Sequence, residues 1–510
     1  MNEFVFGEQR LTIEAVRDIA SGKMKTRLSG AAEFRERINK GADFLDDQLK
    51  KFNGIYGVTT GYGDSCGKTV PPEKYYELPL RLTRFHGCGM GRYFDPETTR
   101  AIIAVRLNTL CQGCSGVSLD LLEATARLLE HDILPLIPEE GSVGASGDLT
   151  PLSYIVGTLV GERNVLYKGN TFSSREVFES LGWPLLTLRP KEGLAMMNGT
   201  GVMNAVACLA YSRAEYLADL SCRITAMASI ALKGNKYHFS ERLFEIKPHP
   251  GMGLAAKKIR EDLGGVSSLN VVPERIQDIY SIRCAPHVIG VFYDAGPMFR
   301  SLIEIEMNSA NDNPIIDPDT SSIYHGGHFY GGHIAFAMDS LKNIVANIAD
   351  LLDRQLAVLV DEKFNRGLPP NLSGSNEGYS FNHGFKAVQI AVSSWTAEAL
   401  KGTMPASVFS RSTECHNQDK VSMGTIAARD CIRVLELSEQ VVTACLLAVS
   451  QALRLRIKQG ELDSTSLGQI EVLLSHVSKV FPLVEADRPL ETELRTTLET
   501  VRRREWEVLL

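Results

Sequence analysis

The segment GSVGASGDLT, residues 141–150, decides how the rest of the chain is interpreted. It holds three glycines within seven residues and leads through Pro151 into SYIVGTLVGE, which is apolar enough to form a buried helix. Glycine adopts backbone angles that other residues avoid, and Ser or Asp side chains cap the first N–H groups of a helix. The simplest interpretation is therefore a loop followed by a helix N-terminus.

Two functional interpretations of this loop go further. A phosphate-binding loop fits poorly, because the segment lacks Gly-Lys-Ser/Thr and its glycines do not have the GxGxxG spacing. The alternative is chemical: Ala145-Ser146-Gly147 could cyclise, with the Gly147 nitrogen attacking the Ala145 carbonyl carbon. Only an unhindered, tightly bent backbone allows that attack, and glycines supply such a backbone.

The composition is that of an ordinary globular protein. The chain has 510 residues, of which 44% are hydrophobic and 23% charged, and its formal net charge is -7. We see no basic stripe, so neither nucleic acid nor a membrane is an expected partner. The ten cysteines are too dilute and too irregular for a disulfide framework, and the N-terminus does not resemble a signal peptide. These features predict a reducing, cytoplasmic location.

Helical patterns dominate, and alternating strand patterns such as NVLYKG (164–169) are few. The clearest signals are an N-cap with a first-turn proline at Asp95-Pro96, a Ser118 cap for a helix over 119–134, apolar periodicity over 341–359, a long helix over 430–457 and a capping-box pattern at 466–469. The nearly apolar stretch 441–453 is too short to cross a bilayer and predicts a core helix.

Glycine-rich segments separate these helices, and loops on a rigid scaffold commonly carry function. The length exceeds a single ordinary core. We therefore predict a mostly α fold with an elongated central helical bundle. Residues 1–210 form an N-terminal domain that carries the 141–150 loop, and residues 211–510 form the long-helix bundle. The extensive apolar helix faces also predict an oligomer.

Six segments, in this order, carry a family resemblance. They are YGVTTGYG from Tyr56, the 141–153 loop, Met197-Asn-Gly-Thr200, QDIYSIRC from Gln277, NSANDNP from Asn308 and Asn417-Gln-Asp419. Together they resemble the aromatic amino-acid ammonia-lyase family, which includes histidine, phenylalanine and tyrosine ammonia-lyases and related aminomutases. The resemblance spans residues 10 to 480.

The resemblance implies a cofactor made from the chain itself. In this family Ala145-Ser146-Gly147 would cyclise and lose two waters to give 4-methylidene-imidazole-5-one, an electrophile. Dehydration of Ser146 would supply the methylidene carbon, and Gly147 would need to lack a side chain. Neighbouring helix N-termini would stabilise negative charge on the group. No metal or dissociable cofactor is expected.

The resemblance also implies roles for matching residues. Tyr56 would be the base that removes the β-proton, Arg283 would bind the substrate carboxylate, and Asn198 would hold the oxygen of the electrophile. The other implied contacts to the substrate or electrophile are Tyr280, Gln277, Asn313, Phe329, Lys386, Gln418 and the pair Phe85-His86. Family members are homotetramers whose active sites are each built from three chains, so we expect the same assembly here.

Two further motifs could suggest a metal. Cys111-Gln-Gly-Cys114 is a CxxC, but no second CxxC accompanies it, so we interpret it as chance spacing. His325, His328 and His333 share one loop without nearby carboxylates to orient them. The sequence therefore predicts no metal site.

The residues expected around the aromatic ring of the substrate indicate which amino acid is favoured. His86 can hydrogen-bond a phenol hydroxyl, and Phe85 supplies an apolar wall. By resemblance, Lys386 and Gln418 match phenylalanine and tyrosine lyases, whereas histidine lyases carry Met and Glu there. The favoured activity is elimination of ammonia from L-tyrosine to give 4-coumarate, with L-phenylalanine to cinnamate as a secondary activity. Histidine ammonia-lyase, a tyrosine or phenylalanine 2,3-aminomutase, and a non-enzymatic scaffold remain alternatives.

Overall fold

The computed structural model describes residues 3–51, 54–266, 276–377 and 380–510, and its chain divides into two compact units. The first unit comprises Met1–Ser212, Arg300–Asp339 and Pro405–Arg429, and the second comprises Arg213–Phe299, Ser340–Met404 and Asp430–Leu510. The division predicted above, 1–210 and 211–510, is continuous in sequence. Each observed unit instead takes in three stretches, because several long helices contribute residues to both units.

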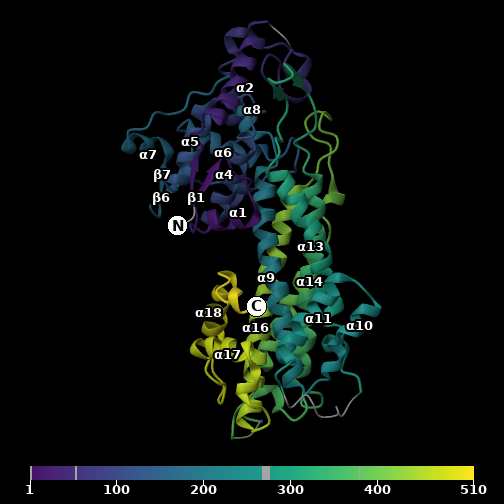
Figure 1. Cartoon of the computed structure of the whole chain (residues 1–510). Helices are drawn as coiled ribbons and strands as arrows, with labels where there is room; N and C mark the ends of the chain where they lie inside the picture. The colour runs from purple at the N-terminus through teal and green to yellow at the C-terminus, as the bar shows by residue number, and fades with distance from the viewer. Residues whose placement is uncertain (1–2, 52–53, 267–275, 378–379) are drawn as a thin grey trace. The chain divides into compact units, whose positions relative to one another are not determined.

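The first unit is built mainly from helices (Figure 1). These helices are α1 (Ile13–Ala20), α2 (Ala32–Lys50), α3 (Leu78–Phe85), α4 (Pro96–Leu110), α5 (Leu119–Glu130), α6 (Leu149–Leu159), α7 (Ser174–Leu181) and α8 (Glu192–Met197). The buried α4 packs against α1, α5 and α8. The predicted N-caps are confirmed: the Asp95 side chain accepts from the Thr98 N–H, and Ser118 accepts from the Leu121 N–H.

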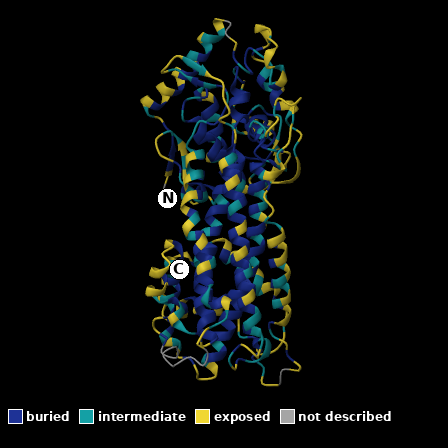
Figure 2. Cartoon of the chain, turned by 90° about the vertical axis from the view of Figure 1, so that its right-hand side faces the viewer, coloured by how far each residue is buried: buried dark blue, intermediate teal, exposed yellow. Residues whose placement is uncertain are grey.

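Four long helices contain residues of both units. They are α9 (Gly201–Ala231), α13 (Ala285–Met307), α14 (Gly332–Val360) and α16 (Gly424–Lys458). Within the second unit their segments run side by side with buried inner faces (Figure 2). Gln355 on α14 donates to the Thr225 hydroxyl on α9 at 3.0 Å, and the Cys445 thiol on α16 lies 3.4 Å from the Leu352 carbonyl oxygen on α14. The mostly helical prediction is confirmed, including the buried stretch 441–453.

The second unit is completed by shorter helices around these long segments. They are α10 (Glu241–Ile246), α11 (Pro250–Leu263), α12 (Tyr280–Arg283), α15 (Lys386–Lys401), α17 (Gln469–Val480) and α18 (Glu491–Arg502). None of the helices within the described residues is both long and apolar enough to cross a membrane.

The strands are short and lie in four small sheets. A parallel pair joins β1 (Glu3–Phe6) to β2 (Lys25–Leu28), and antiparallel sheets contain β3 (Met90–Tyr93) with β5 (Pro138–Glu140), β4 (Leu134–Pro135) with β6 (Asn164–Tyr167) and β7 (Asn170–Ser173), and β8 (Ile315–Asp317) with β9 (Ser322–Tyr324). The strand predicted over 164–169 is confirmed as β6 and the start of its turn.

Two local predictions are wrong. The capping box at 466–469 does not form, because the Ser466 hydroxyl donates to the Asp463 carbonyl at 2.6 Å and Gly468, with a φ of 55°, precedes the helix. The helix predicted over 119–134 ends at Glu130, because Asp132 has a φ of 54° and turns the chain into β4. In both cases a local left-handed residue overrides the sequence pattern.

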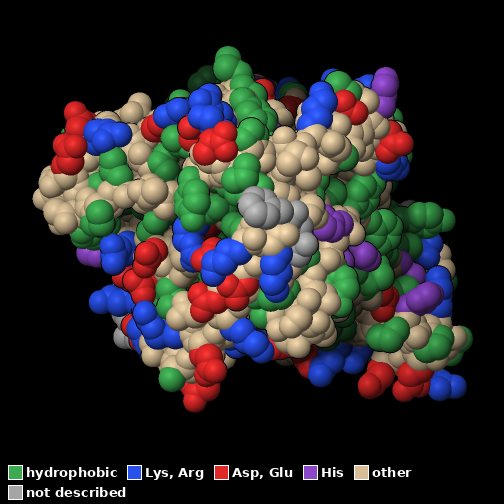
Figure 3. Space-filling model, turned by 90° about the horizontal axis from the view of Figure 1, so that it is seen from above, with side chains coloured by type: hydrophobic (Ala, Val, Ile, Leu, Met, Phe, Trp, Pro, Cys, Tyr) green, Lys and Arg blue, Asp and Glu red, His purple; other side chains and the backbone are tan. Residues whose placement is uncertain are grey.

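The charges on the surface are mixed. On the face seen in Figure 3, basic and acidic side chains are interspersed, and apolar side chains lie among them. This distribution agrees with the small negative net charge of the chain and gives that face no uniform sign.

Candidate active site

The glycine-rich loop joins β5 to α6 and bends sharply at Ser146 and Gly147. Both residues have positive φ, 54° at Ser146 and 76° at Gly147. A side chain at Gly147 would overlap the backbone of Gly199, with which the loop is paired. Two donors reach the Ser146 carbonyl oxygen: Asn198 Nδ2 at 3.1 Å and the Gly199 N–H at 3.2 Å. At this bend, the Ser146 carbonyl oxygen therefore accepts hydrogen bonds from two N–H groups.

Asp148 ties this loop to the N-termini of three helices. Its buried carboxylate accepts from the Val202 and Met203 N–H groups of α9, at 3.0 and 2.8 Å, and from the hydroxyls of Ser142 and of Thr425 on α16. Helix α6 begins at the next residue. Burial raises the pKa of Asp148, although these hydrogen bonds act in the opposite direction. Helix N-termini carry partial positive charge, so the loop lies where negative charge is stabilised.

The buried side chain of Arg106, on α4, holds the segment that carries Asn198. Its guanidinium donates to the carbonyl oxygens of Ala195, Met196 (3.0 Å) and Asn198 (2.8 Å), and to the Asn311 side-chain oxygen at 2.8 Å. Burial lowers the pKa of Arg106 to about 10. The group is thus still protonated near neutral pH, and it satisfies the free carbonyls at the end of α8.

Tyr56, the predicted base, lies in a loop that follows α2 in sequence. Its hydroxyl accepts from the Gly63 N–H at 2.9 Å, and its own N–H donates to His325 Nε2 at 3.2 Å. Burial raises the pKa of Tyr56 above the ordinary value, the Gly63 N–H acts against this, and Glu414 adds to it. The phenolate therefore becomes abundant only at alkaline pH unless a further positive group approaches.

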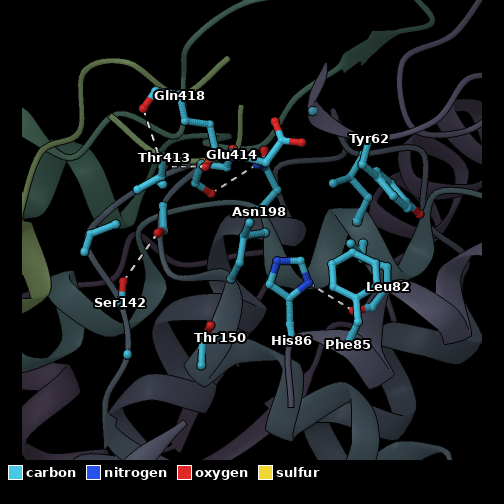
Figure 4. A pocket seen from close by; sticks show the side chains of 18 of the residues that line it. Tyr62, Leu82, Phe85, His86, Ser142, Thr150, Asn198, Thr413, Glu414 and Gln418 are labelled. Carbon is cyan, nitrogen blue, oxygen red and sulfur yellow. Dashed lines mark hydrogen bonds between the residues drawn. The ribbon is translucent and has the colours of Figure 1, made fainter. Parts of the chain in front are cut away.

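A cavity of about 290 Å³ in the first unit brings many of these groups together (Figure 4). It is lined by Tyr56, Tyr62, Gly63, Leu82, Phe85, His86, Gly141, Ser142, Val143, Ala145, Ser146, Gly147, Leu149, Thr150, Leu194, Asn198, Thr413, Glu414 and Gln418. Of the predicted site residues, the lining includes Tyr56, Phe85, His86, Ala145, Ser146, Gly147, Asn198 and Gln418. Segments more than 300 residues apart in sequence thus meet at one cavity.

The pair Phe85-His86 ends helix α3, with ring centroids 4.4 Å apart. His86 Nδ1 lies 3.0 Å from the Leu82 carbonyl oxygen, which can only accept, so Nδ1 carries the proton. Burial lowers the pKa of His86, which keeps the imidazole neutral near pH 7. Its other nitrogen, Nε2, points away from Leu82 (Figure 4) and is a hydrogen-bond acceptor.

A second loop, residues 413–418, contributes polar groups to the same cavity. Gln418 Nε2 donates to the Ser146 hydroxyl at 3.2 Å, and the Glu414 carboxylate accepts from the Asp64 N–H at 2.9 Å. Residues 414–416 all have positive φ, between 49° and 65°. Left-handed backbone is costly for residues other than glycine and is concentrated at functional sites.

Sequence reasoning missed five lining residues with chemical or packing roles. They are Tyr62, Leu82, Leu194, Thr413 and Glu414. A signal was available for two of them, since Tyr62 belongs to the same YGVTTGYG motif as Tyr56, and Glu414 lies close before Gln418. The others reach the cavity only through the tertiary fold.

The remaining predicted residues do not line this cavity in the single chain. Asn313, in the first unit, accepts from the Gly326 N–H at 2.8 Å, and Phe329 lies in the loop that follows. The second unit carries Gln277, Tyr280, Arg283 and Lys386. Tyr280 is 73% exposed, and Arg283 lies against its ring, 4.6 Å from the centroid, while donating to the Asp278 carbonyl at 3.0 Å.

No group of three or more His, Cys, Asp or Glu side chains is arranged to hold a metal ion in the described part of the chain. His325 instead accepts from the backbone of Tyr56. The ten cysteines are present as thiols.

Comparisons with known proteins agree with the geometry. The profile of the aromatic amino acid lyase family matches residues 11–473. The chain is 35% identical to a histidine ammonia-lyase of Caldanaerobacter subterraneus, over 98% of this chain and 97% of that protein, and 33% identical to a tyrosine ammonia-lyase of Cereibacter sphaeroides, over 96% and 95%. The crystal structure of tyrosine aminomutase from Streptomyces globisporus superposes with a TM-score of 0.92 at 32% identity, covering 99% of this chain and 98% of that one.

These similarities extend over nearly the whole chain rather than over one motif. The profile match includes the glycine-rich loop, the Tyr56 motif and the Gln418 loop, which are the segments that meet at the cavity. The chain therefore belongs to the aromatic amino acid lyase family.

Proposed function

We propose that the protein eliminates ammonia from an aromatic L-amino acid, with L-tyrosine as the preferred substrate and L-phenylalanine as the second. The products are 4-coumarate and cinnamate. One observation carries the proposal: the Ser146 carbonyl oxygen is held by two N–H donors, Asn198 Nδ2 and the Gly199 N–H, beside a cavity that Tyr56 also lines.

The residues at the loop fit a methylidene-imidazolone formed from Ala145, Ser146 and Gly147. The left-handed bend at Ser146 and Gly147 and the lack of room for a side chain at Gly147 favour ring closure. The carbonyl oxygen of Ser146 would become the exocyclic oxygen of the ring. When formed, the group would supply an electrophilic carbon for the substrate amine. No metal or dissociable cofactor is needed for this chemistry.

The side chains of the cavity supply the remaining chemistry. Tyr56 takes the proton from the β-carbon of the substrate, the bond between the α-carbon and nitrogen breaks, and ammonia leaves. Asn198 and the Gly199 N–H would hold the oxygen of the methylidene-imidazolone and stabilise negative charge there, which is usually the largest single term in catalysis. The N-termini of α6, α9 and α16, tied together by Asp148, add to this stabilisation.

The ring of the substrate lies against Phe85 and His86 in this proposal. The unprotonated Nε2 of His86 accepts a hydrogen bond from a phenol hydroxyl, which a phenylalanine ring cannot offer. Gln418 carries no charge, so it does not attract an imidazolium. Both features favour a hydroxyphenyl ring over imidazole.

The carboxylate of the substrate requires cations that the cavity of one chain lacks. We propose that Arg283, with Tyr280, Gln277 and Lys386, serves the active site of another subunit, and that Asn313 and Phe329 complete a shared site in a homotetramer. The 73% exposure of Tyr280 supports this. So does an apolar stripe on α13, Val291, Met298 and Ile305, which are 46%, 47% and 56% exposed at seven-residue spacing. Such stripes mark helix interfaces.

Two alternatives share this site. Histidine ammonia-lyase is the name of the relative from C. subterraneus, and a tyrosine aminomutase is similar in structure. An aminomutase would return ammonia to the β-carbon rather than release it.

The ten thiols suit a reducing compartment, so we also propose a cytoplasmic location.

A substrate panel tests the proposal. Purified protein is incubated with L-tyrosine, L-phenylalanine, L-histidine and L-3,4-dihydroxyphenylalanine, and the conjugated acrylates are followed by absorbance while chromatography detects β-amino acids. We expect 4-coumarate to form fastest and Tyr56→Phe to form almost none. Fastest turnover of histidine, or a β-amino acid as the main product, would contradict the proposal.

A further inference from the structure

Arg106 is a buried charge that the reaction described above does not use. Its side chain is 1% exposed. Among the residues that the structure describes, its hydrogen-bond acceptors are all uncharged: the carbonyl oxygens of Ala195, Met196 and Asn198, the Thr109 hydroxyl and the Asn311 amide oxygen. Asp312 and Asp148 act on it only at longer range. Burying a charge without a directly bonded carboxylate costs stability, and an apolar residue of similar volume is often the more stable choice.

A single residue, Gly199, separates the Arg106 guanidinium from the glycine-rich loop. A side chain built on Gly199 would overlap the Arg106 guanidinium, and one built on Gly147 would overlap Gly199. The guanidinium therefore lies on one side of Gly199 and the bend of the loop lies on the other.

One peptide unit connects the two sides. The carbonyl oxygen of Asn198 accepts from Arg106 Nη2 at 2.8 Å, and the N–H of Gly199 donates to the Ser146 carbonyl oxygen at 3.2 Å. This carbonyl and this N–H belong to the same peptide group, in which a trans bond points them in opposite directions. A charged donor on the carbonyl polarises the peptide and strengthens the N–H as a donor.

We propose that Arg106 is a positioning residue that fixes and polarises the Asn198–Gly199 peptide so that its N–H stabilises negative charge on the Ser146 oxygen while the electrophile forms. The inference rests on the proposed function, because it concerns how Ala145, Ser146 and Gly147 mature. It assigns the buried charge a role in chemistry rather than in folding.

The maturation steps show where this charge matters. The Gly147 nitrogen bonds to the Ala145 carbonyl carbon, and the Ala145 oxygen leaves as water with the protons of the Gly147 and Ser146 nitrogens, which leaves a C=N bond. Ser146 then loses its α-proton and its hydroxyl group as a second water. Removal of the α-proton places negative charge on the Ser146 carbonyl oxygen, which the Gly199 N–H and Asn198 Nδ2 stabilise. A weaker hydrogen bond from the Gly199 N–H should therefore slow the second loss of water more than the first.

Intact-protein mass spectrometry of Arg106 variants tests the inference without measuring activity. Arg106→Met removes the charge at similar volume, and Arg106→Lys keeps the charge but cannot reach all the carbonyls. We expect the wild type to be lighter than its sequence by two waters. In folded Arg106→Lys and Arg106→Met most molecules should retain one or both waters, and the absorbance of the conjugated ring should fall by the same fraction.

Arg456 offers a matched control in the second unit. It is 2% exposed and also donates to backbone carbonyls, those of Ala231, Asn365 and Arg366. Unlike Arg106, it also donates directly to a carboxylate, that of Glu461, at 2.5 Å. Arg456→Lys should lose two waters like the wild type. Circular dichroism and thermal unfolding establish which variants are folded.

The outcomes separate the inference from the proposed function. Full loss of two waters in folded Arg106→Lys and Arg106→Met would overturn the inference, and so would failure of both to fold while Arg456→Lys folds, since Arg106 would then act on stability alone. A wild-type protein of full mass would instead overturn the proposed function itself.

Discussion

The side-chain amide of Asn198 donates a hydrogen bond of 3.1 Å to the carbonyl oxygen of Ser146. Together with the Gly199 N–H it gives that oxygen two donors. Asn198→Leu, which is close in volume, removes one of them, and loss of one such donor typically lowers kcat about 10²–10³-fold. We expect kcat to fall by this amount while KM changes little, as steady-state kinetics can measure.

The control for this variant is Asn204→Leu on α9, a buried amide outside the cavity lining whose side chain has no hydrogen-bond partner among the described residues. It should keep near-wild-type kinetics. Equal losses in the two variants would assign the effect to packing rather than to the Ser146 oxygen.

His86 should select the hydroxylated ring. His86→Leu removes the Nε2 acceptor and extends the apolar wall beside Phe85. Since a neutral hydrogen bond is worth ~0.5–1.5 kcal/mol and an unpaired buried hydroxyl costs ~1–3 kcal/mol, the ratio of kcat/KM for tyrosine to that for phenylalanine should fall about 10–100-fold. An unchanged ratio would show that this pair does not contact the para position.

The pH dependence of kcat/KM should follow the protonation of the Tyr56 hydroxyl. A base must be deprotonated to act, and the pKa of Tyr56 is raised by burial and further by Glu414. Activity is therefore lost as pH falls through the raised pKa of Tyr56. Glu414→Gln removes the negative charge, lowers the pKa of Tyr56 and should shift the acidic limb of the kcat/KM profile to lower pH. The exposed Glu73→Gln, outside the cavity lining, is the control. A shift to higher pH in Glu414→Gln would contradict the assignment.

A shared active site predicts complementation between inactive variants. Tyr56→Phe lacks the proposed base, and Arg283→Lys lacks the planar fork that binds a carboxylate, which should cost at least ~1–3 kcal/mol in kcat/KM. If the two residues act from different subunits, co-expression of both variants should form mixed tetramers in which about a quarter of the sites have both native residues. No recovery of activity in mixed tetramers would place both residues in one chain.

Much of the fold and part of the site could be predicted from local sequence. Asp95 and Ser118 cap the predicted helices, because capping depends on residues three positions apart. The bend at Ser146 and Gly147 follows from glycine content in the same way. These features require no knowledge of distant parts of the chain.

Features that depend on distant contacts could not be predicted. Asp148 stands just before α6 but its side chain does not cap that helix; its carboxylate instead accepts from the N–H groups that begin α9 and from Thr425 on α16. Arg106 resembles any helix arginine in sequence, but burial against α8 makes it a support for Asn198.

The capping box predicted at Ser466 is absent for a local reason. The Ser466 hydroxyl donates to the Asp463 carbonyl oxygen and therefore does not cap the helix.

The mass of the intact protein tests the central claim most directly, because the electrophile changes the covalent structure of the chain. If Ala145-Ser146-Gly147 matures as proposed, the wild-type protein is lighter than its sequence by two waters. The Ser146→Ala variant should lack this deficit relative to its own sequence and should lose nearly all ammonia release. A wild-type protein that has its full mass and still forms the acrylate, or a Ser146→Ala variant that remains fully active, would contradict the account.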